Sequence, residues 1–142
     1  MNTEQQLKQA RWNTLLFLRE VDESLLHYIG GKTRNHILWH AGHLYVTCEK
    51  FVFQNEQLPD GFLTSFAKGT SPLNGQSTPS IEDVTKALEE QMNRIEHAGE
   101  RAVEPIETAT GFSLRDQQSQ LVYALYHEGM HFGIMKQIQL HG

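Results

Sequence analysis

The chain has 142 residues, 39% hydrophobic and 20% charged, which is enough for one globular domain. Twelve basic residues against seventeen acidic ones give a formal net charge of −5, which argues against a nucleic-acid-binding protein. No apolar run approaches the roughly 18–20 residues of a membrane span, and the polar N-terminus does not resemble a signal peptide. With a single cysteine, Cys48, we expect a cytoplasmic protein without an internal disulfide.

The first predicted helix covers residues 3–29. Its apolar residues recur at helical spacing, and the pair Gly30-Gly31 is a typical C-terminal stop. One polar residue, Asp22, interrupts the apolar stripe. It could orient a histidine side chain, but a misjudged helix face explains it more simply.

A second helix is predicted from about Asn35, a favourable N-cap residue, to about Gln54. Residues 56–79 then change character, because proline and glycine breakers replace the helical pattern. Only three large apolar residues could pack this segment against the rest of the domain, namely Phe62, Leu63 and Phe66. Its length indicates either a functional loop or a long crossover.

Capping signatures mark the last two predicted helices. Ser80 and Asp83 precede a third helix that fades near Ala102, and Ser113 and Asp116 precede a fourth helix over about 114–140. With four helices and no credible strand, we predict an all-α four-helix bundle forming a single domain over 1–142. The short first link and the long second link favour up-down-down-up topology, with a crossover between helices 2 and 3.

Eight histidines are the unusual feature of the composition. His127 and His131 lie four residues apart, so both imidazoles lie on one helix face, which Ala124, Ile134 and Ile138 mark as inward-facing. Buried imidazoles without partners are costly, and one metal ion would satisfy both. The alternative is a pair of core histidines that hydrogen-bond to backbone or hydroxyl groups.

A third ligand should come from another helix. The second helix offers three histidines along one flank, namely His36, His40 and His43, and periodicity alone does not choose among them. Any one of them could equally be a solvated or half-buried side chain.

Two stretches resemble the DinB-like (YfiT-related) metalloprotein superfamily. Residues Asn35–Leu44, with Trp39 and then Gly42-His43-Leu44, resemble the second-helix signature that marks the first metal ligand. The stretch His127–Gly133 is similar to the closing motif, in which both histidines bind metal. The four-helix layout with a long link also agrees. The resemblance implies that His43, His127 and His131 are the ligands.

The chain departs from the family at one position. The closing motif usually continues with glutamine after Gly133, where this chain has Ile134, so that contact is not carried over, whereas the ligands are. The sequence from Trp39 to His43 is most similar to the DinB-like domain that opens the sulfoxide synthases of ergothioneine assembly. That similarity hints at thiol substrates.

Three imidazoles leave a metal ion at least one open position, as in catalytic sites. Nitrogen ligands suit Zn²⁺ first, with Ni²⁺ or Fe²⁺ as alternatives, and do not suit Ca²⁺ or Mg²⁺. The resemblance implies a metal-dependent hydrolase or a transferase for low-molecular-weight thiols, acting on a small molecule. The alternatives are a non-catalytic metal-binding or sensing module and a plain structural bundle.

Other polar and aromatic residues near these histidines have open roles. His40, one turn from His43, could be an acid/base group or a fourth ligand, or merely a polar residue at the rim. Glu128 is expected in a salt bridge or on a solvated face, and Cys48 in the core. Tyr123 and Tyr126 could line a cleft, although aromatic packing is their commoner role.

A second apolar row on the second helix, formed by Trp39, Val46 and Phe53, needs a cover. The 56–79 segment could supply it. Because DinB-like proteins are often homodimers, the expectation is instead that a second copy covers this row.

Overall fold

The computed structural model describes residues 1–29, 35–71 and 78–141, and most of them are helical. Four long helices dominate: α1 (Thr3–Glu20), α2 (Ile37–Cys48), α4 (Ile81–Ile95) and α5 (Gln117–His141). A π-helix, η2 (Glu49–Phe53), continues α2 directly. The shorter elements are η1 (Glu23–Leu25), α3 (Phe62–Phe66), η4 (Ala98–Glu100), β1 (Ile106–Glu107) and β2 (Ser113–Leu114).

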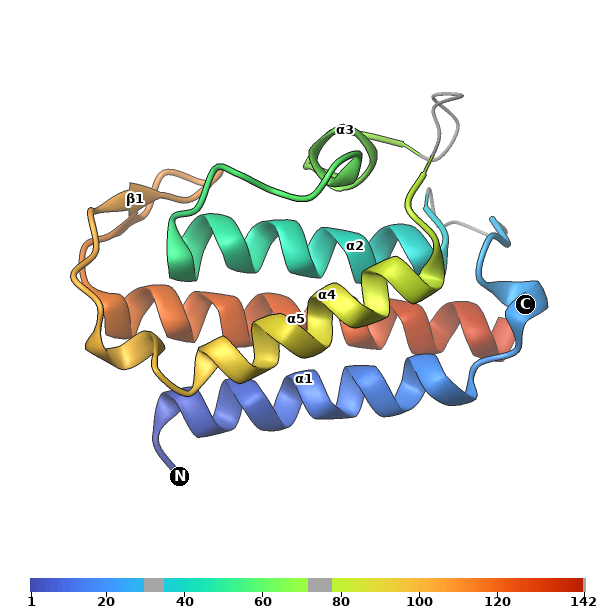
Figure 1. The fold of residues 1–142 in the computed structure, drawn as a ribbon, viewed down its shortest axis with the longest axis horizontal. Coiled ribbons are helices and arrows are strands. Elements are labelled where there is room, and N and C mark those ends of the chain that lie inside the picture. The colour runs from blue at the N-terminus through green and yellow to red at the C-terminus, as the bar shows by residue number, and fades with distance from the viewer. Residues whose placement is uncertain (30–34, 72–77, 142) are drawn as a thin grey trace.

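The long helices pack side by side. Helix α1 lies against α4 and α5, and α2 lies against the same two helices. In Figure 1, α1 and α5 run in one direction and α2 and α4 in the other. The segment between α2 and α4 returns along the outside of α2 and carries α3, which packs on α2.

Two clusters of buried apolar side chains fill the space between these helices. The larger cluster joins α1, α2, α4, α5 and α3, and the smaller one lies where η2, η4 and the first part of α5 meet. The amphipathic stripe of α4 accounts for its burial, since Val84, Leu88 and Ile95 are fully buried. Every residue of α2 is buried, so this helix lies in the interior of the domain.

The first helix is shorter than the sequence predicts. Helix α1 ends at Glu20 because Val21 adopts an extended backbone, with φ −67° and ψ 141°. Asp22 then caps η1 by accepting a hydrogen bond from the Ser24 backbone N–H at 2.9 Å. Asp22 is exposed, so its suggested role beside a metal-binding histidine is wrong, and the simpler explanation holds. The predicted stop at Gly30-Gly31 lies outside the described residues.

Two other helix starts differ in detail from the prediction. His36, rather than Asn35, caps α2, because its Nδ1 accepts a hydrogen bond from the Trp39 backbone N–H at 3.0 Å. Before α5, Ser113 belongs to strand β2, and Asp116 alone caps the helix by accepting from the Ser119 backbone N–H at 2.7 Å.

The start of α4 agrees with the prediction, but its end does not. Ser80 and Asp83 form the predicted capping box. The helix stops at Ile95, well before Ala102, and a 3₁₀ turn follows. The expectation that the chain has no strand is wrong, because β1 and β2 form a small antiparallel hairpin in which Ile106 pairs with Leu114.

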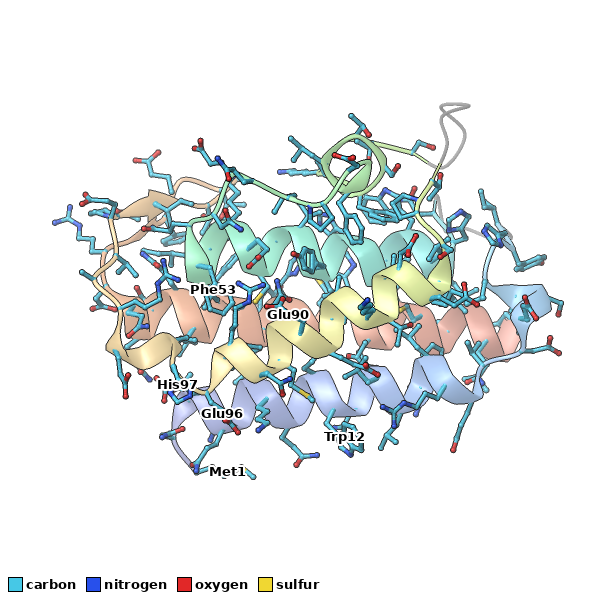
Figure 2. All side chains as sticks on the ribbon, in the orientation of Figure 1. Met1, Trp12, Phe53, Glu90, Glu96 and His97 are labelled. Atoms are coloured by element: carbon cyan, nitrogen blue, oxygen red, sulfur yellow. The ribbon has the colours of Figure 1, made fainter. Side chains whose placement is uncertain are left out.

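The second apolar row on α2 and η2 is covered within one chain. Trp39, Val46 and Phe53 are all buried, and the Trp39 indole N–H donates to the Thr70 Oγ1 at 3.0 Å. The Arg94 guanidinium lies 4.5 Å from the centre of the Phe53 ring, at the α2 end near the hairpin (Figure 2). This row therefore gives no reason to expect a homodimer. Across the described ranges, the helices fall short of the length and apolarity that a membrane span requires.

Candidate metal centre

Three histidines converge between α2 and α5. His43 comes from α2, and His127 and His131 come from successive turns of α5. One ring nitrogen from each lies within 4.8 Å of the corresponding nitrogens of the other two. The ring centroids are 4.3 Å apart for His127 and His131, and 4.9–5.0 Å apart for the pairs with His43. All three residues of this three-histidine cluster are buried, each with 7% of its surface exposed.

The backbone of α3 orients the His43 ring. His43 Nδ1 lies 2.8 Å from the Phe66 carbonyl oxygen, which can only accept a hydrogen bond. The proton is therefore on Nδ1, and Nε2 carries the lone pair that a metal ion requires. The hydroxyl of Thr47 lies 3.4 Å from this Nε2.

A glycine allows α3 to approach this closely. A Cβ atom at position 42 would lie 2.3 Å from the Phe66 ring, so any residue larger than glycine would displace that ring. On another side of the imidazole, Trp39 stacks on His43 with a centroid distance of 4.6 Å and an interplanar angle of 12°. The segment after α2 thus hydrogen-bonds to both rings of this stack: the Phe66 carbonyl accepts from His43, and the Thr70 hydroxyl accepts from Trp39.

Of the other two histidines on α2, only His40 contacts the cluster. His40 Nδ1 and His131 Nδ1 are 2.9 Å apart, so one of them donates a hydrogen bond to the other. His40 does not belong to the set of converging nitrogens. His36 caps α2, and its ring packs edge-on against His27 with centroids 5.1 Å apart.

Burial keeps these imidazoles neutral near pH 7. Burial, followed by the neighbouring histidines, lowers the pKa from 6.5 to about 2 for His131, to about 3 for His127 and to about 4 for His40. Burial also lowers the pKa of His43. Since a metal ion binds neutral imidazole, the cluster is ready to accept one at neutral pH without losing protons.

Glu128, next to His127 in the sequence, faces a different part of the core. Its carboxylate accepts hydrogen bonds from Arg11 Nε at 3.0 Å, Arg11 Nη2 at 3.1 Å and Thr14 Oγ1 at 2.8 Å. Arg11 Nη1 also donates to Gln91 Oε1 at 2.7 Å. Of the two roles considered for Glu128, the salt bridge is correct, and the ion pair is buried.

Cys48 and the tyrosines complete the surroundings. Cys48 is buried as predicted, and burial raises the pKa of its thiol to about 12, so it is no nucleophile at neutral pH. Tyr123 stacks on His127 with centroids 6.2 Å apart, and its other neighbours include Phe51 at 4.6 Å. Tyr123 and Tyr126 both line a pocket at the start of α5.

The sequence predicted the three histidines as ligands, but it did not predict the groups that orient them, such as the Phe66 carbonyl beside His43. The Phe66 carbonyl is a backbone group, which leaves no mark in a sequence pattern. The available signal was Gly42, a helix-breaking residue in the middle of an apolar helix, which often marks a close approach of another segment.

A comparison with known families decides the assignment. The profile of the DinB superfamily matches residues 6–135, which span the four long helices except the first three residues of α1 and the last turns of α5. The chain belongs to the DinB superfamily. Members of this superfamily bind metal ions, and the three buried histidines of this chain could bind a divalent one. No curated protein matches the chain.

Proposed function

We propose that this DinB protein binds one divalent transition-metal ion through His43, His127 and His131. The observation that carries the proposal is the convergence of three buried ring nitrogens within 4.8 Å. Their lowered pKa values and the fixed tautomer of His43 fit a metal ion better than a proton. Nitrogen ligands favour Zn²⁺, with Ni²⁺ or Fe²⁺ as alternatives.

We propose that the bound metal serves an enzyme that acts on a small molecule. Three protein ligands leave room for a further group, and a bound Zn²⁺ would act there as a Lewis acid toward water or a thiol. Both a hydrolase and a transferase for a low-molecular-weight thiol use this chemistry. Helices α1 and α2 each pack against both α4 and α5, and α1 and α5 run opposite to α2 and α4. This arrangement supports an up-down-down-up four-helix bundle as the scaffold.

For His40 we propose a positioning role. When His131 binds metal through Nε2, its Nδ1–H donates to His40 Nδ1 at 2.9 Å and fixes the ring orientation. His40 Nε2 then carries the proton. That N–H leaves His40 able to serve as the acid/base group predicted from the sequence, a role that a pH–rate profile of a His40 variant would test.

Metal analysis of the protein purified without a histidine tag tests the metal site. We expect about one transition-metal ion per chain, and its loss in His43→Ala, His127→Ala and His131→Ala with the helical fold retained. His36→Ala is the matched control. It removes the cap of α2, which costs about 1 kcal/mol of stability, but should keep the metal. Wild-type metal content in His127→Ala or His131→Ala would contradict the assignment.

A turnover assay separates the enzyme from a metal-binding or sensing module. Electrophilic substrates should be consumed by the metal-loaded protein, either alone or with bacillithiol, mycothiol or glutathione as the second substrate. Dependence on the thiol would identify a transferase, and its absence a hydrolase. A protein that holds stoichiometric metal without any turnover would support the non-catalytic module instead.

A further inference from the structure

A pocket of about 650 Å³ lies between the β1–β2 hairpin and the first turns of α5. We call it the hairpin pocket and define it by its apolar and aromatic lining, which is Phe112, Leu114, Val122, Tyr123 and Tyr126. Three of these side chains are largely exposed, at 71% for Phe112, 50% for Val122 and 65% for Tyr126. Exposed apolar groups gathered around one hollow are typical of a binding site.

The hairpin wall of the pocket is held in place. Gln120, buried in α5, donates from its amide to the carbonyl oxygens of Glu104 at 2.9 Å and Leu114 at 3.1 Å. Gln54 at the end of η2 also bonds both backbone groups of Glu104. Between the strands, Gly111 takes φ +90°, and the Thr108 N–H donates to the Phe112 carbonyl at 2.8 Å. The pocket is therefore preformed.

Several polar groups of the lining are already satisfied within the chain. Thr108 and Thr110 bond each other through their hydroxyls at 3.2 Å. Asp116 accepts from the Ser119 backbone N–H, and the Ser119 hydroxyl donates to the Asp116 carbonyl at 2.8 Å. What remains to contact a ligand is mainly apolar and aromatic surface, which favours an aromatic group.

Tyr123 connects the pocket to the three-histidine cluster. It lines the pocket, and its ring stacks on His127 with an interplanar angle of 21°. The two residues are one helical turn apart, which is about 6 Å along α5. Tyr123 is thus a wall shared by the pocket and the cluster. The pocket volume lies within the range of small-molecule sites.

We propose that the hairpin pocket holds the aromatic group of a small-molecule substrate whose metal-binding end reaches the three-histidine cluster past Tyr123. This inference rests on the proposed metal site and adds the substrate class. It commits to a small molecule because the pocket is preformed, of matching volume and adjacent to the cluster through Tyr123.

Two hydroxamic acids with the same metal-binding end test the proposal on the Zn²⁺-loaded protein. By isothermal titration, 3-phenylpropanohydroxamic acid should bind at least tenfold more tightly than acetohydroxamic acid. Val122→Asp should remove this preference, while the affinity for acetohydroxamic acid stays unchanged. Leu140→Asp, an exposed substitution at the far end of α5, is the matched control and should keep the preference. Equal affinities, or a preference that survives Val122→Asp, would overturn the proposal.

A second arm works on the metal-free protein and separates failure of the pocket from failure of the metal site. Saturation-transfer NMR should detect 3-phenylpropan-1-ol on wild type and Leu140→Asp but not on Val122→Asp. If this alcohol binds to the metal-free protein while acetohydroxamic acid does not bind to the Zn²⁺-treated protein, the metal site has failed and the pocket has not. If the chain forms a dimer that Val122→Asp dissociates, a second copy fills the pocket and the proposal fails.

Discussion

His127 and Glu128 are neighbours on α5, yet they belong to two buried polar clusters of opposite character. Glu128 meets a full set of partners from α1, including the Arg11 guanidinium and the Thr14 hydroxyl. Among the described residues, the ring of His127 contacts other imidazoles and the Tyr123 ring. Along residues 1–29, 35–71 and 78–141, no acidic side chain joins the three-histidine cluster.

The difference lies in how far the protein itself satisfies each cluster. A buried carboxylate that is paired with a guanidinium and a hydroxyl has its charge and lone pairs satisfied by the protein itself. Three converging imidazoles resist protonation, because burial and the neighbouring histidines lower the pKa values of His127 and His131, and their converging nitrogens lie close enough for one cation. The first cluster joins α1 to α5, and the second could bind a divalent cation from solution.

Acid should have the largest effect, because five histidines act together. The pKa values of His36, His40, His43, His127 and His131 are all lowered in the fold. The unfolded chain therefore binds more protons below about pH 6.5, and the metal-free protein loses stability as the pH falls from 6.5 toward 4. Urea unfolding across this range measures the loss.

A double variant isolates the contribution of the cluster to this acid sensitivity. In His127→Gln/His131→Gln, the urea midpoint should fall less steeply between pH 6.5 and 4, since two of the depressed imidazoles are gone. Identical slopes for variant and wild type would show that the cluster does not resist protonation.

Breaking the other cluster should cost the most of any single substitution discussed here. Arg11→Met leaves the buried Glu128 carboxylate without its counter-ion, and we expect a loss of about 3–5 kcal/mol in the free energy of unfolding. Arg19→Met is the control, because its ion pair with Glu89 is exposed and should contribute less than about 1 kcal/mol. Equal losses in both variants would mean that burial of the Arg11 pair is unimportant.

Metal addition should stabilise only a chain with an intact three-histidine cluster. A free Zn²⁺ concentration 100-fold above the dissociation constant should raise the free energy of unfolding by about 2.7 kcal/mol. Thermal unfolding with and without Zn²⁺ measures the gain, which His131→Ala should abolish. Arg19→Met should keep it. A gain that survives in His131→Ala would place the ion elsewhere.

The smallest of these effects concerns His40. His40→Leu removes the acceptor for His131 Nδ1–H and should weaken metal binding about 10- to 100-fold. His40→Asn should retain most of the affinity, because its amide oxygen can accept in place of Nδ1. Competition with a chelator measures both variants, and an unchanged affinity in His40→Leu would assign His40 no positioning role.

Local patterns predicted part of the fold and part of the site. Four-residue spacing places His127 and His131 on one face whatever the tertiary structure, and the Ser80-Asp83 box marks the start of α4 by local hydrogen bonds. Choosing His43 over His36 and His40 needed the family resemblance, because all three lie on one flank. The ligand roles themselves stay predictions.

Long-range contacts account for what the sequence did not predict. The burial of Arg11 depends on Glu128, which is 117 residues away, so a charged residue at this position gave no sign of lying in the core. Each strand of the hairpin is only two residues long, which is too short to give a recognisable strand pattern. The hairpin is held by hydrogen bonds from Gln120 and Gln54, which lie outside it. The early end of α1 follows from the extended backbone at Val21.

The stacking of Trp39 on His43 gives the protein an optical reporter of its own metal site. The chain has two tryptophans. Trp12 points away from the helices below α1 in Figure 2, whereas the buried Trp39 indole lies parallel to the His43 ring. In Trp12→Phe, the remaining tryptophan emission, excited selectively over the tyrosines, comes from Trp39. Its intensity should change as a cation withdraws electron density from the stacked imidazole, so occupancy can be followed without label or cofactor.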